Sequence, residues 1–283
     1  MIFKSLQGIH FNTLFEAFQT AFIDYEMQLN RKELQTMLIR RGFVPELSFA
    51  AFENDKIVSF TFNGIDNFNG IRTAYDTGTG TLKEFRGKGM ATQIFKFSIP
   101  VLKEAGIKQY LLEVLQHNTK AVSVYKKLGF EVKREFNYFD QDIEGLINNK
   151  KEIPSGYHLH YIDLPSKFEL NKFYDFIPSW QNTFDSIKRK LKDFKINGAF
   201  YENELIGFCI FEPDSGDITQ IAVHKNHRRK GIATVLLQNV LKHNHHLSVK
   251  CINTQENCSS ISGFLKSFNI PVKGKQFEMI KCL

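Results

Sequence analysis

The chain has 283 residues, of which 42% are hydrophobic and 24% are charged. This length exceeds the usual size of one hydrophobic core and predicts two domains of about 140 residues each. No run of about 18 apolar residues predicts a membrane span. The net charge of +7 is mild and forms no basic stripe with aromatic neighbours, so nucleic acid is not expected as a partner.

The first half of the chain alternates helical and extended patterns. The predicted elements are helices at 12–21 and 30–41, strands at 47–52, 57–63 and 72–82, a helix at 91–105, a strand at 110–115, a helix at 119–127 and a strand at 130–139. Asn30 is the expected N-cap of the second helix. Pro100 should kink the helix that contains it.

The second half repeats this order. Its predicted elements are a helix at 171–191 interrupted at Pro178, strands at 205–211 and 218–223, a helix at 232–241, a strand at 247–252, a helix at 260–267 and a hairpin at 272–282 that turns at Gly274. A polar segment broken by proline and glycine, residues 148–156, is the expected linker. The predicted domains are therefore residues 1–147 and 157–283.

One short phrase occurs twice, each time between a strand-like run and a helical run. The copies are Arg86-Gly87-Lys88-Gly89-Met90-Ala91 and Arg228-Arg229-Lys230-Gly231-Ile232-Ala233, both of the form Arg-x-x-Gly-x-Ala. Their first residues are 142 positions apart, about half of the chain, which indicates an internal duplication.

The chemistry of this phrase suits an anion. Glycine at the turn and a small residue after it let the backbone approach a bulky group, and the first N–H groups of the next helix have no partner within the helix. The positive end of the helix dipole and the neighbouring cations favour negative charge there. Each copy therefore predicts a phosphate cradle. A P-loop nucleotidase is disfavoured, because Gly-Lys-Ser/Thr follows neither turn.

The cysteines and histidines predict no metal site. The four cysteines, Cys209, Cys251, Cys258 and Cys282, form neither a CxxC pair nor an even framework. Three histidines lie close together at 243, 245 and 246, without cysteine or carboxylate at ligand spacing, so a solvated turn is expected. The N-terminus has no secretion-signal pattern. We expect reduced thiols and a cytoplasmic location.

The order of elements resembles the GNAT superfamily of N-acetyltransferases. In the first half the resemblance covers about residues 45–139 and includes Leu112-Glu113-Val114, then Asn118 and Ala121, then Tyr125-Lys126-Lys127-Leu128-Gly129-Phe130. The second half keeps Gln220-Ile221-Ala222-Val223 and the glycine turn, with Phe264 at the expected place of Tyr125. The resemblance implies an α/β (α+β) fold of two GNAT-like domains, each a mixed, mainly antiparallel sheet flanked by helices.

It also implies acetyl-CoA as cofactor and acyl transfer to an amine as the reaction. An unprotonated amine attacks the thioester, a backbone N–H of the central strand holds the oxyanion, and thiolate leaves. Tyr125 is then the expected proton donor to the thiolate, and Asp76 the expected base, with Glu113 as a second candidate. The expected cofactor contacts are Thr79, Thr81, Arg86, Gly87, Lys88, Gly89, Met90, Ala91, Asn118, Ile221, Val223, Arg228, Arg229, Lys230, Gly231, Ile232 and Ala233.

We therefore expect an enzyme that acetylates a primary amine of a small molecule or peptide, with the first domain active and the second partly degenerate. A non-catalytic acyl-CoA sensor or interaction module is the alternative. An aminoacyl or peptidyl transferase that uses a charged tRNA is a third possibility, favoured by the more basic second half. The acceptor amine, the acyl chain length and the oligomeric state stay open.

Overall fold

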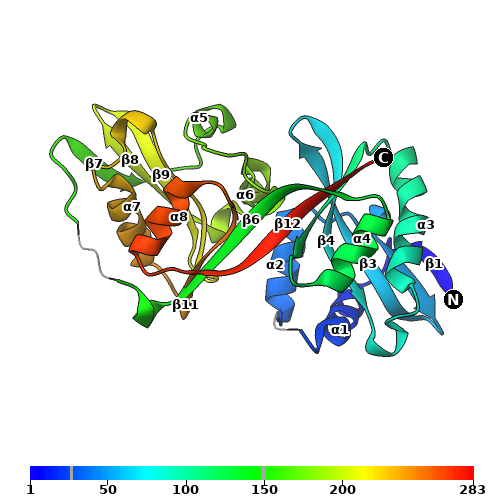
Figure 1. Cartoon of the computed structure of the whole chain (residues 1–283). Coiled ribbons are helices and arrows are strands. Elements are labelled where there is room, and N and C mark those ends of the chain that lie inside the picture. Colours follow the sequence, from blue (N-terminus) through cyan, green and yellow to red (C-terminus); the bar gives the residue numbers. More distant parts are fainter. Residues whose placement is uncertain (26–27, 148–150) are drawn as a thin grey trace. The chain divides into compact units, whose positions relative to one another are not determined.

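The computed structural model describes residues 1–25, 28–147 and 151–283, which form two compact units (Figure 1). Unit 1 contains Met1–Arg134 together with Phe277–Leu283, and unit 2 contains Glu135–Gln276. Of the expected linker, residues 148–150 lie outside the described residues. Each unit is a sheet flanked by helices, as predicted.

Unit 1 contains most of the first half of the chain. Its elements are β1 (Ile2–Ser5), α1 (Phe11–Phe22), α2 (Arg31–Arg41), β2 (Phe49–Glu53), β3 (Lys56–Phe68), β4 (Ile71–Thr81), α3 (Met90–Glu104), β5 (Gln109–Leu115), α4 (Thr119–Lys127), and short 3-10 turns η1 (Pro45–Leu47) and η2 (Lys83–Phe85). The strands follow the order β1-β2-β3-β4-β5, then the end of β12 (Val272–Cys282). Neighbours from β1 to β4 are antiparallel, whereas β4 and β5 are parallel.

Helices cover both faces of the unit 1 sheet. The Phe18 ring of α1 lies 6.4 Å from Phe60 of β3. Thr61 points to the opposite face, because successive strand residues alternate, and its hydroxyl lies 3.1 Å from that of Tyr110. Phe95 of α3 packs on Tyr110 with ring centroids 5.3 Å apart. Thus α1 and α3 lie on opposite faces of the sheet.

Unit 2 has the same plan with shorter helices before its central strands. Its elements are β6 (Glu131–Asp142), η3 (Ile143–Gly145), β7 (Tyr157–Tyr161), α5 (Lys167–Asn171), η4 (Trp180–Asn182), α6 (Phe184–Arg189), η5 (Leu191–Asp193), β8 (Lys195–Tyr201), β9 (Glu204–Glu212), β10 (Asp217–Val223), η6 (Lys225–His227), α7 (Ile232–Leu241), β11 (Ser248–Gln255) and α8 (Ser259–Ser267). The strands follow the order β6-β11-β10-β9-β8-β7.

Two of the elements predicted from the sequence are wrong. The helix expected at 171–191 is replaced by α5, η4 and α6, because proline at 178 lacks an N–H and disfavours a helical residue before it. The hairpin expected at 272–282 is one continuous strand, β12, with Gly274 inside it. Pro100 lies within α3, which continues through it to Glu104.

Each predicted domain ends in a strand segment that belongs to the compact unit of the other domain. The C-terminal residues of β12 belong to unit 1, where the Leu283 N–H donates to the Lys108 carbonyl at 2.9 Å. There, Arg134 and Glu278 form two hydrogen bonds of 2.8 and 2.6 Å. Conversely, the second part of β6 pairs with β11 in unit 2. The compact units therefore differ from residues 1–147 and 157–283 at these two strands.

Candidate active site

Each unit contains a fork between two parallel strands. In unit 1 the β4–β5 register runs from Thr73 opposite Gln109 to Asp76 opposite Leu112, after which β4 continues to Thr81. The β10–β11 register of unit 2 contains one pair, Asp217 with Lys250. An extended ligand that lies in such a fork would contact the backbone edge of the central strand.

A bulge shapes the central strand at each fork. Thr77 is the extra residue of β4, because Phe62 pairs with Gly78 and Asn63 with Asp76. Thr219 is the extra residue of β10. The two bulges lie 142 positions apart in the sequence, so the duplication preserves this bend as well as the glycine turns.

Both helix starts beyond the forks are open. Gly89 and Gly231 are the N-caps of α3 and α7, with φ of 74° and 83°, and neither helix has a side-chain cap. The first bonds within these helices are donated by Gln93 and Val235. Within the described residues, the N–H groups of residues 90–92 and 232–234 donate to no backbone carbonyl, so both helix starts present free donors.

The two motif arginines hold the loops in place. Arg86 donates to the Thr81 carbonyl at 3.2 Å, to the Ala21 carbonyl at 2.9 Å and to the Asp24 carboxylate at 3.1 Å. Arg228 repeats the first contact, donating to the Val223 carbonyl at 2.9 Å, and also pairs with an aspartate. Their guanidinium groups are thus already engaged, which supports a positioning role rather than direct contact with an anion.

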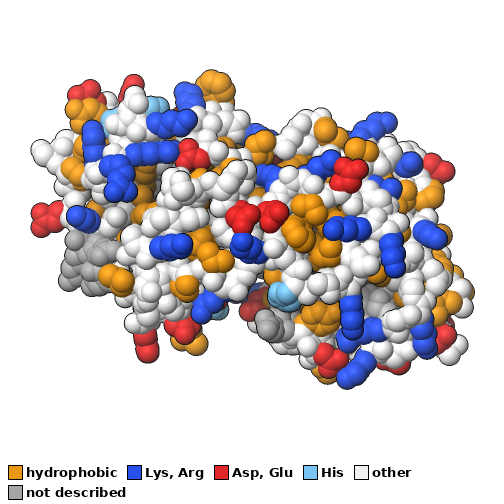
Figure 2. Space-filling model, viewed as in Figure 1, with side chains coloured by type: hydrophobic (Ala, Val, Ile, Leu, Met, Phe, Trp, Pro, Cys, Tyr) orange, Lys and Arg blue, Asp and Glu red, His pale blue; other side chains and the backbone are white. Residues whose placement is uncertain are grey.

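The second position of the motif differs between the units. Gly87 has φ of 75°, and its counterpart Arg229 has φ of 63°, a conformation that costs a non-glycine residue roughly 1 kcal/mol. The side chains of Lys88, Arg229 and Lys230 are exposed, and Lys230 donates to the Tyr157 hydroxyl at 2.9 Å. Figure 2 shows lysine and arginine side chains gathered on the α7 side of unit 2.

On the α4 side of the unit 1 fork, the structure brings Tyr125 and Asp76 together. The Tyr125 hydroxyl lies near enough to the Asp76 carboxylate for each group to shift the pKa of the other, and this carboxylate accepts from the Thr79 hydroxyl at 2.8 Å and from the Gly78 N–H at 3.0 Å. Burial raises the pKa of Asp76 to about 6, although these hydrogen bonds oppose the shift. Burial and the charge of Asp76 raise the pKa of Tyr125 well above its ordinary value, so the phenol keeps its proton at neutral pH.

A second tyrosine–carboxylate pair lies on the α2 side of the same fork. The Tyr75 hydroxyl donates to Glu113 at 3.0 Å, and the Arg41 guanidinium of α2 lies 6.0 Å from the Tyr75 ring. Glu113 is the first residue of β5 beyond its last pair with β4. Sequence reasoning missed Tyr75, because its contact with Glu113 depends on the register between strands that are far apart in the chain.

The other expected cofactor residues of unit 1 lie around the fork. Thr79 and Thr81 are on the part of β4 beyond its last pair with β5. The Thr81 hydroxyl lies 2.7 Å from the Ser59 hydroxyl. Asn118 is the N-cap of α4, and its side chain accepts from the Ala121 N–H at 3.2 Å. Met90, the first residue of α3, is buried, and the next residue, Ala91, is half-buried.

Unit 2 has neither a tyrosine in the place of Tyr125 nor a glutamate in the place of Glu113. Its helix α8 begins after Cys258, as α4 begins after Asn118. Counting from these N-caps, the place of Tyr125 is taken by Leu265, not by Phe264 as expected from the sequence, and the place of Glu113 by Asn253. The Leu265 carbonyl accepts from Ile270 as the Tyr125 carbonyl accepts from Phe130, both at 3.0 Å.

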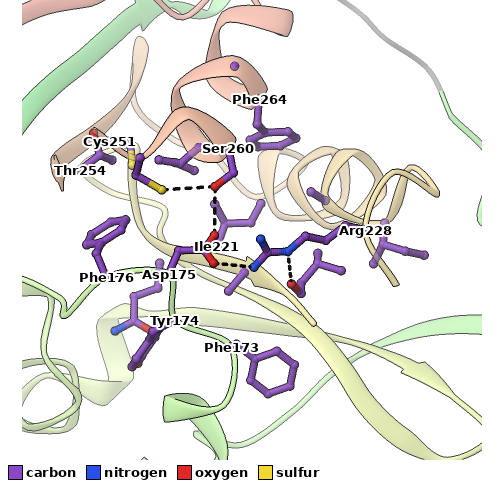
Figure 3. Close-up of a pocket in the computed structure, with 18 of the residues that line it drawn as sticks. Phe173, Tyr174, Asp175, Phe176, Ile221, Arg228, Cys251, Thr254, Ser260 and Phe264 are labelled. Atoms are coloured by element: carbon purple, nitrogen blue, oxygen red, sulfur yellow. Dashed lines mark hydrogen bonds and ion pairs between the residues drawn. The ribbon is translucent and has the colours of Figure 1, made fainter. Parts of the chain in front are cut away.

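A cleft of about 1050 Å³ occupies the unit 2 fork (Figure 3). Ile221 and Val223 of β10, the α7 start and α8 line it. In Figure 3, Asp175 lies between Arg228 and Ser260, each of which donates to it at 3.0 Å. The expected unit 2 residues therefore surround one cleft.

Two other expectations concern ligands and membranes. Within residues 1–25, 28–147 and 151–283, no group of three or more His, Cys, Asp or Glu is arranged to hold a metal ion. Over the same residues, no helix is both long and apolar enough to cross a bilayer.

Paired forks with open helix starts define the class of acyl-CoA-dependent N-acyltransferases. The chain belongs to the acetyltransferase (GNAT) family, whose model matches residues 11–130 and 158–262. The tandem fold and the enzyme class expected from the sequence are thereby confirmed.

Similar proteins include N-alpha-acetyltransferases. The chain is 33% identical over 120 residues to N-alpha-acetyltransferase 30 of Schizosaccharomyces pombe, covering 40% of this chain and 80% of that protein. It is 24% identical over 139 residues to N-alpha-acetyltransferase MAK3 of Arabidopsis thaliana, covering 47% and 69%.

Two solved structures share the fold over nearly the whole chain. One is a tandem GNAT protein from the clavulanic acid biosynthesis pathway, at a TM-score of 0.75 and 13% identity, covering 99% of this chain and 98% of that one. The other is a GCN5-related N-acetyltransferase from Sphaerobacter thermophilus, at a TM-score of 0.72 and 13% identity, covering 99% and 95%.

Proposed function

We propose that the protein transfers an acetyl group from acetyl-CoA to a primary amine, and that unit 1 carries out the transfer. The observation that carries this proposal is the Tyr125–Asp76 pair on one side of the β4–β5 fork, with Glu113 on the other side. The fork thus offers a proton donor and a proton acceptor on opposite faces of the place where a thioester would lie. The family of the chain supports the same reaction.

The residues of the loop after β4 suit coenzyme A. The free N–H groups from Gly87 to Ala91 would hold the diphosphate, with Lys88 nearby as an exposed cation. Arg86 would fix the loop rather than touch the phosphates. The pantetheine arm would lie along the edge of β4 at Thr79 and Thr81. Acetyl-CoA supplies the activated acyl group when it is bound.

The amine is proposed to approach from the α2 side. Glu113 would take the proton that an ammonium must lose, directly or through water, and Tyr75 would orient this carboxylate. The amine nitrogen then attacks the thioester carbonyl, and a backbone N–H beside the Thr77 bulge stabilises the oxyanion. When the carbon–sulfur bond breaks, Tyr125 on the α4 side donates its proton to the thiolate, and the second proton that the nitrogen loses as the amide forms passes through water to the Tyr125 phenolate.

The sequence predicts that Asp76 is the base, but the geometry favours another role for it. Its carboxylate accepts hydrogen bonds from Thr79 and Gly78 and faces Tyr125, so it lies on the leaving-group side of the fork. There it would orient the Tyr125 hydroxyl and brace the bulge. We therefore propose Asp76 as a positioning residue and Glu113 as the base.

We propose a peptide α-amino group as the first acceptor to test, because two similar proteins are named N-alpha-acetyltransferases. We also propose that the protein acts in the cytoplasm. The experiment measures coenzyme A release from acetyl-CoA with a panel of short peptides and small primary amines. Acceptor-dependent release supports the proposal. Binding of acetyl-CoA without release by any amine would instead support a non-catalytic acyl-CoA-binding module.

A further inference from the structure

A row of three hydroxyl groups, those of Thr79, Thr61 and Tyr110, runs from the unit 1 fork into the core behind it. The Thr79 hydroxyl lies 2.8 Å from the Asp76 carboxylate and 3.0 Å from the Thr61 hydroxyl. The Thr61 hydroxyl lies 3.1 Å from that of Tyr110, which donates to the Asn63 side-chain oxygen at 2.6 Å. Thr61 and Tyr110 are both 0% exposed, so their bonding needs are met within the protein. This hydroxyl row therefore connects Asp76 with Asn63.

Asn63 fixes the direction in which the hydroxyl row donates. Its side-chain N–H donates to the Leu47 carbonyl at 2.7 Å, so its side-chain oxygen is the atom turned to the hydroxyls, and an amide oxygen can only accept. Tyr110 gives its one proton to this oxygen. The Thr61 proton then goes to the Tyr110 oxygen or to the Asn63 oxygen, 3.4 Å away. The Thr61 oxygen is left as an acceptor for Thr79.

The Thr79 hydroxyl has one proton and two acceptors that compete for it. When Asp76 is ionised, its carboxylate is the stronger acceptor, and the buried Thr61 oxygen loses its donor. When Asp76 is protonated, Thr79 can donate to Thr61, and every hydroxyl of the row is satisfied. Since a buried acceptor without a donor is costly, Thr61 favours the protonated form of Asp76.

We infer that Thr61 is a positioning residue of unit 1, whose hydroxyl competes with Asp76 for the Thr79 proton and so controls the charge of the carboxyl beside Tyr125. Because Thr61 is fully buried, it acts through Asp76 and not on a bound ligand. This rests on the proposed function, in which Tyr125 donates a proton and Asp76 orients it.

The other groups that act on Asp76 come from the elements packed around it. They are Arg41 of α2, Tyr75 of the same strand, Tyr110 of β5 and Tyr125 of α4. Arg41 favours the ionised carboxylate, whereas burial favours the protonated one and raises the pKa of Asp76 to about 6. Burial raises the pKa of all three tyrosines well above the ordinary value, so they keep their protons where Asp76 titrates.

The first measurement is the titration of Asp76 in the full chain, followed by carbon-13 NMR of aspartate carboxyl groups and assigned with Asp76→Asn. Thr61→Val keeps the side-chain shape without the hydroxyl and should lower the pKa of Asp76 by about one unit, roughly the contribution of one hydrogen bond. Thr61→Ser keeps the hydroxyl and should leave this pKa unchanged. If Thr61→Val does not fold, Thr61→Ala removes the same hydroxyl with a smaller side chain.

Ser59→Ala is the matched control. It removes another fully buried hydroxyl, two positions earlier on the same strand, which donates to the Gly80 carbonyl at 2.9 Å and not to the hydroxyl row. It should leave the titration of Asp76 unchanged.

The second measurement is kcat for coenzyme A release as a function of pH. The step that belongs to Asp76 should move with its titration in Thr61→Val and stay in place in Thr61→Ser. A merely structural role would instead make both substitutions lower kcat at every pH. That result overturns the inference, as does an unchanged Asp76 titration in Thr61→Val. A shifted titration in a protein whose wild type releases no coenzyme A with any amine overturns the proposed function and leaves the competition for the Thr79 proton standing.

Discussion

The hydroxyl of Tyr125 and the carboxylate of Asp76 lie near each other on the α4 side of the unit 1 fork, where each shifts the pKa of the other. The contact joins helix α4 to the bulge of β4, because Asp76 also accepts the N–H of Gly78 on the far side of Thr77. A buried, raised-pKa carboxyl at this point makes the stability of the protein depend on pH.

The pKa of Asp76 is raised from 3.8 to about 6 in the folded protein, so between these values the folded state binds more protons than the unfolded state. The free energy of unfolding must then fall as pH rises through this range. Asp76→Asn removes this cost. The free energy of unfolding of this variant, relative to that of wild type, should increase by about 2 kcal/mol from pH 4.5 to pH 7.5, measured by urea unfolding. An equal difference at both pH values would contradict the raised pKa.

Glycine at position 80 is required by packing. A Cβ there would lie 2.5 Å from the Phe60 ring, which is fully buried, and 3.0 Å from Ala21. Gly80→Ala should lower the free energy of unfolding by about 1–3 kcal/mol. Gly78→Ala is the control, because its Cβ would meet only the Phe18 ring at 3.8 Å. Equal effects of the two changes would argue against this packing.

The exchanged C-terminal strand should stabilise unit 1. Glu278 is 2% exposed and pairs twice with Arg134. Glu278→Ala would bury a guanidinium without its carboxylate and should cost about 3–5 kcal/mol. Glu131→Ala, which removes the exposed partner of Lys133 on the same strand, should leave the stability nearly unchanged, because solvent screens an exposed ion pair. Thermal melts of both variants compare the two pairs, and a neutral Glu278→Ala would place the end of β12 elsewhere.

The loops and the fold class could be predicted because their signals are local. Glycines 89 and 231 have left-handed backbones that the sequence marks by residue type alone. The Tyr125 counterpart could not be located, because the second half is two residues shorter between the loop glycine and the N-cap Cys258. Leu265 and Phe264 are therefore adjacent candidates until the helix bounds are known.

The exchanged strands were not predictable for a different reason. The apolar pattern of residues 272–282 predicts extended backbone but does not say beside which strand it pairs. The contact between Tyr75 and Glu113 likewise depends on a register between strands 38 residues apart. Both features are set by packing between distant parts of the chain.

Arg86 should affect cofactor affinity more than the chemical step. Arg86→Leu removes its bonds to Thr81, Ala21 and Asp24, so the α3 loop would lose its fixed position. We expect KM for acetyl-CoA to rise roughly tenfold with a smaller change in kcat. Arg228→Leu is the matched control in unit 2 and should leave this KM unchanged, because unit 1 is the proposed site of transfer. A fall in kcat at unchanged KM for Arg86→Leu would assign this arginine to the chemistry.

The most direct test of the central claim, that unit 1 transfers the acetyl group with Tyr125 as proton donor, is the steady-state rate of coenzyme A release by Tyr125→Phe with a saturating acceptor. The variant keeps the aromatic packing against Phe95 and loses only the hydroxyl. We predict a fall in kcat of about 100-fold or more, with acetyl-CoA still bound as by the wild type in calorimetry. A wild-type rate in this variant would contradict the account.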